Sequence, residues 1–145
     1  MKNEEQLGQA FYALEQYKGQ IENLSRQRQM VMLSLEEHMR AKITLSEWSK
    51  QKEGHEMLMP IGANTFLYAK AASPDKALIG IGGDVVMEDS SSGAMDKLED
   101  VIKILEDADK KIIARISEIE KQSAELSAEV EGEMKAAEGR NKRGD

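Results

Sequence analysis

The first part of the chain shows a regular alternation of apolar and polar positions. Residues 5–52 contain no proline, and apolar residues recur in pairs three apart within a seven-residue repeat, which is the pattern of a coiled-coil helix. The repeat positions, called the seam below, are Leu7, Ala10, Leu14, Tyr17, Ile21, Leu24, Arg28, Val31, Leu35, His38, Lys42 and Leu45. Only Arg28, His38 and Lys42 interrupt the apolar stripe. The pattern predicts one long amphipathic helix over residues 1–53.

The last part of the chain follows the same rule, with seam residues that alternate spacings of four and three. These residues are Leu98, Ile102, Leu105, Asp109, Ile112, Ile116, Ile119, Ser123, Leu126, Val130, Glu133 and Ala137. The run Ser90–Gly93 supplies helix caps, so a second helix is predicted over 90–138. At 1.5 Å per residue each helix would be roughly 70 Å long. We therefore expect an antiparallel coiled coil, in which the polar seam residues set the register rather than act in catalysis.

Between the two helices the pattern changes to short apolar runs separated by turn residues. The runs 57–61, 65–71, 77–82 and 85–88 are strand candidates, and Gly62–Asn64, Ser73–Lys76 and Gly82–Asp84 punctuate them. The simplest interpretation is two β-hairpins over residues 54–89. The predicted fold class is α+β, a long antiparallel coiled-coil hairpin with two β-hairpins between its helices.

Four short strands with open edges make a marginal sheet unless the edges pair or close into a barrel. The chain is therefore predicted to oligomerise, with its strands contributing to a β-barrel shared between subunits. The residues expected to make these assembly contacts are Leu58, Ile61, Phe66, Tyr68, Ile79, Ile81 and Val85.

Composition narrows the functional classes. The formal net charge is −7 and only 4% of the residues are aromatic, which argues against a phosphate-backbone grip on nucleic acid and against a large self-contained core. The chain has no cysteine and only His38 and His55 as histidines, so we expect no disulfide, no metal and no redox chemistry. No apolar run approaches a membrane span, and residues 1–6 lack a secretory signal. A cytoplasmic protein without a membrane association is expected.

No arrangement of residues indicates catalysis. The run Gly80–Asp84 matches neither dinucleotide-binding nor P-loop patterns, and is interpreted as a tight turn. No nucleophile stands beside a base, and the carboxylate pairs lie on exposed helices without a pocket to shift their pKa values. We expect neither enzyme activity nor a cofactor.

The free ends of the two predicted helices are enriched in apolar residues. Apolar residues gather where an antiparallel pair would bring the start of the first helix and the end of the second together, namely Leu7, Phe11, Tyr12, Val130, Met134 and Ala137. Methionine and aromatic side chains suit adaptable contacts, so this tip is a candidate binding surface for other proteins. The alternative is that these side chains only complete the coiled coil, although Tyr12 falls off the seam. The polar segment 139–145 is predicted to be disordered.

The segment Leu58–Phe66, followed by Gly80–Gly82, Val85–Val86 and the helix opening at Ala94, resembles the alpha subunits of archaeal prefoldin. The resemblance covers nearly the whole chain. It implies an ATP-independent chaperone, a hexamer of two alpha and four beta subunits with a double β-barrel body and six projecting coiled coils. It also implies that the tips hold non-native proteins and pass them to a group II chaperonin. Alpha subunits carry two hairpins and beta subunits one, which favours the alpha type here.

Three other hypotheses stay open on the sequence alone. The first is a structural coiled-coil spacer or assembly subunit without client-holding activity. The second is a nucleotide-exchange cochaperone with a long helix and a β-domain, although that layout does not require a second, matched helix. The third is an enzyme, which the missing catalytic residues oppose.

Overall fold

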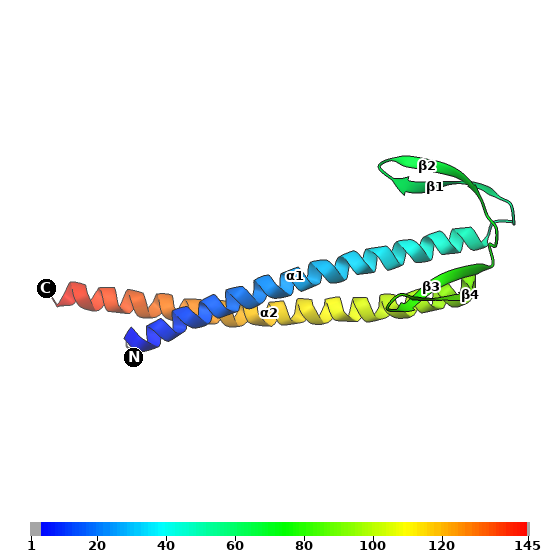
Figure 1. Ribbon diagram of the computed structural model, residues 1–145. Coiled ribbons are helices and arrows are strands. Elements are labelled where there is room, and N and C mark those ends of the chain that lie inside the picture. Colours follow the sequence, from blue (N-terminus) through cyan, green and yellow to red (C-terminus); the bar gives the residue numbers. More distant parts are fainter. Residues whose placement is uncertain (1–3, 145) are drawn as a thin grey trace. The chain divides into compact units, whose positions relative to one another are not determined.

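The computed structural model describes residues 4–144, which form two long helices with two β-hairpins between them (Figure 1). The elements are α1 (Glu4–Ser49), β1 (Glu56–Gly62), β2 (Thr65–Lys70), β3 (Lys76–Gly82), β4 (Val85–Ser90) and α2 (Ser91–Arg143). The predicted α+β fold is confirmed. In the described part of the chain, neither helix contains a stretch apolar and long enough to cross a membrane.

The chain divides into two compact units. The terminal unit contains the residues up to 32 and those from 107 onward, and the central unit contains residues 33–106. The terminal unit is a pair of helix segments, whereas the central unit holds the end of α1, both hairpins and the start of α2.

The seam positions explain why the helices pair. Every seam residue of α1 is buried or half-buried, and so is every seam residue of α2 except Ala137. Ile119 is the largest fully buried side chain among the described residues. An amphipathic helix buries its apolar stripe only against a partner, so each helix depends on the other.

Polar seam residues form ion pairs across the helices. In the terminal unit Arg28 Nε donates to Asp109 Oδ1 at 2.8 Å, and in the central unit Lys42 pairs with Glu99. His38 instead bonds locally, with its Nδ1 donating to the Ser34 carbonyl oxygen at 2.7 Å. The two ion pairs act as register markers, because a slip of either helix would separate the charges.

The Arg28–Asp109 pair gives a direct test of register. Asp109→Arg is expected to destabilise the chain by about 1–2 kcal/mol, between the values for exposed and buried pairs, because the Asp109 side chain is only 16% exposed. Adding Arg28→Asp should restore most of the loss. Urea unfolding measures both, and Lys135→Ala, which breaks the exposed Glu131–Lys135 pair, serves as a control with a cost of about 0.5 kcal/mol or less. If the chain with both Asp109→Arg and Arg28→Asp recovered no stability, the Arg28–Asp109 pair would have no role in setting the register.

The two hairpins repeat one another at an offset of twenty residues. β1 pairs antiparallel with β2, and β3 with β4, and within the described strands the two hairpins form separate two-stranded sheets. Equivalent backbone bonds close their bases, from Ala71 N to His55 O at 2.9 Å and from Ser91 N to Asp75 O at 2.8 Å. Ala71 and Ser91 are both buried. Each hairpin is thus a copy of one small structural unit.

The turn residues account for the shape of each hairpin. Ala63 and Asn64 both have positive φ, as a two-residue type I′ turn requires. Gly62 and Gly82, with φ of 103° and 131°, stand where the register of each hairpin shifts, which marks a bulge that only glycine accommodates readily. The turn chemistry predicted from the sequence therefore defines both hairpins.

The junction between β4 and α2 is locked by side chains. Ser90 Oγ accepts the N–H of Gly93 at 3.0 Å as a helix cap. Asp89 accepts the N–H of Ser90 at 2.8 Å and pairs with Lys97 at 2.7 Å. A Cβ on Gly93 would lie 2.5 Å from Asp89 Oδ1, so alanine here would require the Asp89 carboxylate to move.

Two glycine substitutions in α2 should therefore act in opposite directions. Gly132→Ala is expected to stabilise the chain by about 0.5–1 kcal/mol, since nothing lies within 4 Å of its Cβ position and alanine favours a helix. Gly93→Ala should instead destabilise it by displacing the Asp89 carboxylate from Lys97. Thermal unfolding of the two variants checks the prediction, and equal stabilisation by both would contradict it.

Two carboxylates of the central unit should make it sensitive to acid. Lys97, with the Ser90 N–H, lowers the pKa of Asp89, and Lys42 lowers the pKa of Glu99. A carboxyl whose folded pKa is depressed adds stability above its unfolded pKa and loses that contribution as pH falls through the lower, folded value. Stability should therefore decline below about pH 4. Circular dichroism melts from pH 6 downward should show a shallower decline for Lys42→Met than for the unchanged chain, and parallel curves would count against this cause.

The end of α2 differs from the prediction. The sequence predicts disorder over 139–145, but α2 continues to Arg143. Arg140, Lys142 and Arg143 occupy its last turn, where cations interact favourably with the carboxyl end of a helix. This electrostatic support, together with the tolerance of a helix for a single glycine such as Gly139, explains why α2 extends beyond residue 138. Asp145 lies outside the described residues.

Candidate functional site

The residues of the candidate tip come from the two ends of the helix pair in the terminal unit. Figure 1 shows the start of α1 and the end of α2 at the same end of this pair. The heptad register follows from the Arg28–Asp109 ion pair. Leu7 lies three heptads before Arg28 on α1, and Val130 lies three heptads after Asp109 on α2. Because the helices are antiparallel, this register sets Leu7 and Val130 opposite each other.

Leu7 and Val130 close the coiled coil. Leu7 is half-buried and Val130 is only 5% exposed. Ala137 lies one heptad beyond Val130, where the described part of α1 has already ended, and it is exposed. While the helices stay paired, Val130 is closed to a partner protein, and Leu7 is partly exposed.

Phe11, Tyr12 and Met134 are the exposed large apolar side chains of the described residues at this end, and we call these three residues the tip patch. Phe11 is 48% exposed, Tyr12 67% and Met134 50%. Because none of them lies on the seam, the coiled coil does not need their side chains. Such a surface offers adaptable apolar contact, and it holds no pair of groups that would support proton transfer or nucleophilic attack.

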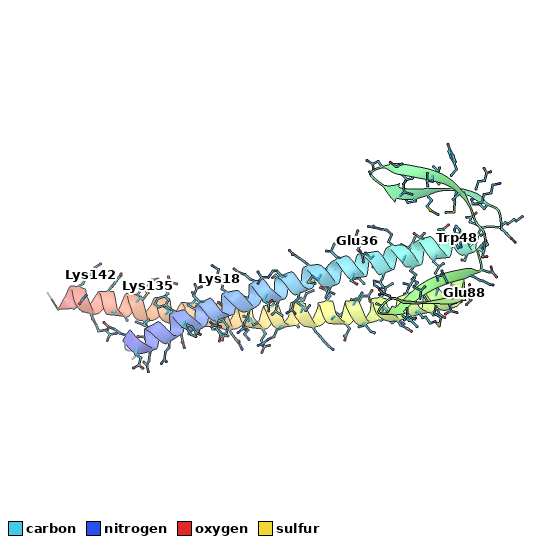
Figure 2. All side chains as sticks on the ribbon, in the orientation of Figure 1. Lys18, Glu36, Trp48, Glu88, Lys135 and Lys142 are labelled. Atoms are coloured by element: carbon cyan, nitrogen blue, oxygen red, sulfur yellow. The ribbon has the colours of Figure 1, made fainter. Side chains whose placement is uncertain are left out.

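Charged residues of both signs surround the tip patch. Glu4 and Glu5 lie in the first turn of α1, and Lys135 pairs with Glu131 at 3.3 Å on α2. Figure 2 shows Lys135 and Lys142 along the last part of α2. The three apolar side chains therefore stand among charged, hydrated residues of both signs.

The hairpins carry the second candidate surface. Six of the seven residues predicted to make assembly contacts are exposed in the single chain, and Ile79 is half-buried. The exposed six are Leu58, Ile61, Phe66, Tyr68, Ile81 and Val85. Tyr68 is 94% exposed, although a side chain of this size normally gains much from burial.

Both faces of the first hairpin are apolar. Leu58 pairs with Tyr68 on one face, and Met59 pairs with Leu67 on the other. Strands that are apolar on both faces are normally buried on both. Sequence reasoning missed five exposed apolar residues of the two hairpins, which strand alternation in the apolar runs would have found: Met59, Leu67, Leu78, Val86 and Met87.

Comparison with known proteins decides the family. A family model described as "Prefoldin subunit" matches residues 17–136. The chain belongs to the prefoldin family. The match spans both hairpins and most of both helices, and it begins after Phe11 and Tyr12 of the tip patch.

Relatives and a solved structure agree with this assignment. The chain is 34% identical over 109 residues to a "Prefoldin subunit alpha" of Methanothrix thermoacetophila, covering 75% of this chain and 71% of the relative. It is 31% identical over 138 residues to a "Prefoldin subunit alpha" of Methanococcus aeolicus, covering 93% and 92%. A chain of filamentous PFD from Methanocaldococcus jannaschii shares the fold, with a TM-score of 0.69, 24% identity and coverage of 81% of this chain and 98% of that one.

Prefoldin membership gives the two surfaces a functional setting. The chain is a chaperone subunit, and its family consists of chaperones rather than enzymes and forms oligomers that include beta subunits. An oligomerising subunit needs a surface that other subunits cover, and the apolar hairpins have that character. A chaperone also needs a surface that contacts unfolded protein, for which the tip patch is the candidate.

Proposed function

We propose that the chain is the alpha-type subunit of a cytoplasmic chaperone built from two alpha and four beta subunits. The assembled chaperone binds non-native proteins at its coiled-coil tips and delivers them to a group II chaperonin without ATP. The observation that carries this proposal is the tip patch, in which Phe11, Tyr12 and Met134 are exposed at the end of a long helix pair.

The energetics of the tip patch suit reversible holding. Burying one apolar side chain contributes about 1.5–3 kcal/mol, and part of the gain from three side chains is lost to ordering a flexible client. One tip therefore binds weakly and releases readily. Several tips on one client gain through effective concentration, and competition by the chaperonin can then release the client without a nucleotide cycle.

The hairpins support the assembly part of the proposal. Each is a two-stranded sheet with unpaired edges, which is marginal alone and gains stability when other strands pair with it. The first hairpin is apolar on both faces, so it would gain stability if other subunits buried both of them. The presence of two hairpins also supports the alpha type, as the family resemblance implies.

A structural spacer without client-holding activity is the alternative. Single exposed apolar residues are common on protein surfaces, so Phe11 and Tyr12 alone do not distinguish a spacer from a chaperone subunit. The two functions differ in what the assembled complex does to an unfolded protein.

The test uses the full chain assembled with its beta-type partner. A chemically unfolded client protein is diluted into buffer without ATP, and light scattering follows its aggregation. We expect the complex to suppress aggregation when tips are in excess over client, while the same mass of an unrelated coiled-coil protein does not. Aggregation at an unchanged rate would favour the spacer.

A further inference from the structure

The two hairpins share a chemical feature that the function proposed above does not use. Each carries a methionine in the equivalent cross-strand pair, because Met59 lies opposite Leu67 in the first hairpin and Met87 lies opposite Ile79 in the second. By the offset of twenty residues, Met59 corresponds to Ile79, and Leu67 corresponds to Met87. Both hairpins therefore place one thioether in the same pair, on the first strand in one hairpin and on the second strand in the other.

Both thioether side chains are open to solvent in the single chain. Met59 is 47% exposed and Met87 is 38% exposed. Leu67, the partner of Met59, is also exposed, whereas Ile79, the partner of Met87, is half-buried. A small solute such as hydrogen peroxide therefore reaches both methionines before the chain assembles.

Methionine is the only sulfur-containing residue of this protein. The chain has nine methionines and no cysteine, and the expectation of no redox chemistry rested on the missing thiols alone. Hydrogen peroxide transfers one oxygen atom to a methionine sulfur. The S–O bond forms as the O–O bond breaks, the sulfur loses two electrons, and the second oxygen leaves as water. The product is a polar sulfoxide, which methionine sulfoxide reductases convert back.

The cost of this oxidation depends on whether the hairpins are covered. In the free chain the sulfoxide oxygen is hydrated, so the hairpin is little affected. In an assembly that covers the hairpin faces, the same oxygen is buried, and a buried polar group without a hydrogen-bond partner is strongly penalised. The cover also keeps peroxide away from methionines that are already buried. Oxidation should therefore act on free chains and spare complete assemblies.

We propose that Met59 and Met87 are oxidation sites through which a peroxide controls the assembly of this chain with beta-type subunits. The proposal rests on the assembly part of the function proposed above and adds a reversible chemical control to it. Oxidised free chains stay out of the assembly until a reductase restores their thioethers.

The test compares assembly before and after oxidation. The full chain is treated with hydrogen peroxide, the excess is removed with catalase, and mass spectrometry identifies the oxidised residues. Mass photometry then follows assembly with the untreated beta-type partner. Three chains are compared, namely the unchanged chain, the chain with Met59→Leu and Met87→Leu, and a matched control with Met30→Leu and Met39→Leu, two exposed positions on α1. The ratio of dissociation constants after and before peroxide is taken for each chain, so the effect of the substitutions themselves cancels.

The unchanged chain and the helix control are expected to assemble about tenfold more weakly for each sulfoxide that is buried. The chain without Met59 and Met87 should keep a ratio near one. Treatment with methionine sulfoxide reductases should restore assembly of the oxidised chains. When the complex is assembled before peroxide is added, Met30 should be oxidised severalfold faster than either hairpin methionine.

The outcomes separate this proposal from the proposed function. Equal weakening of all three chains would overturn it, because other oxidised residues would then be responsible. So would full assembly of the unchanged chain with both hairpin methionines oxidised, which would leave the proposed assembly standing. Loss of the helical circular dichroism signal after peroxide would also overturn it, since oxidation would then act by unfolding. Failure of the unoxidised chain to assemble would overturn both.

Discussion

A chain carrying Phe11→Ser, Tyr12→Ser and Met134→Ser is expected to lose most of its ability to keep an unfolded client soluble. Each substitution removes an apolar contact worth about 1.5 kcal/mol or more, or about tenfold in affinity. The losses multiply when several tips hold one client. Because all three side chains are exposed, the helices should form as before. Light scattering of a diluted client in the presence of the assembled complex measures the effect.

The control for the tip variant replaces three exposed apolar residues that lie elsewhere on the helices. Met30→Ser, Leu33→Ser and Ile104→Ser remove comparable apolar surface, and we expect this variant to hold clients nearly as well as the unchanged chain. Equal losses in the two triple variants would mean that any exposed apolar residue serves. Undiminished protection by the tip variant would disprove the role of the tip patch.

Aspartate at Leu58 and Tyr68 is expected to prevent assembly with beta-type subunits. The two residues are cross-strand partners on one face of the first hairpin, and both are exposed in the single chain. A charge there is solvated in the free chain, but each would be buried without a partner in a closed barrel, at a cost of several kcal/mol. Mass photometry should therefore show free chains in place of the hexamer, while circular dichroism stays unchanged.

Lys18→Asp is the matched control for charge. Lys18 is exposed on α1 (Figure 2) and lies far from the hairpins in the sequence. This variant should assemble to the same mass as the unchanged chain. A hexamer formed by the Leu58→Asp and Tyr68→Asp chain would show that this face of the hairpin is not part of the assembly surface.

The fold follows from the sequence because its signals are local and repeated. The heptad repeat predicts the seam residue by residue, including Arg28 and Asp109, since a coiled coil reuses one contact geometry along its length. Turn glycines such as Gly62 and Gly82 mark the hairpins for a similar reason. The end of α2 is less predictable, because polar composition favours disorder there while Arg140 and its basic neighbours support the helix end.

The candidate sites follow from the sequence only in part. Tyr12 was identifiable because it lies off the seam, whereas Val130 lies on the seam and is buried. Met59 and Leu67 lie on the second face of the first hairpin, and strand alternation within residues 57–61 and 65–71 would have identified them.

Photocrosslinking in the assembled complex tests the central claim most directly, namely that clients are held at the tip patch. Benzophenone is placed at Tyr12→Cys or at Asn23→Cys, an exposed polar position on the same face of α1, about 16 Å further along the helix. An unfolded client is added without ATP, irradiated and analysed by gel. The account predicts strong client adducts at Tyr12 and few at Asn23. Adducts of equal strength at both positions, or none at Tyr12, would contradict it.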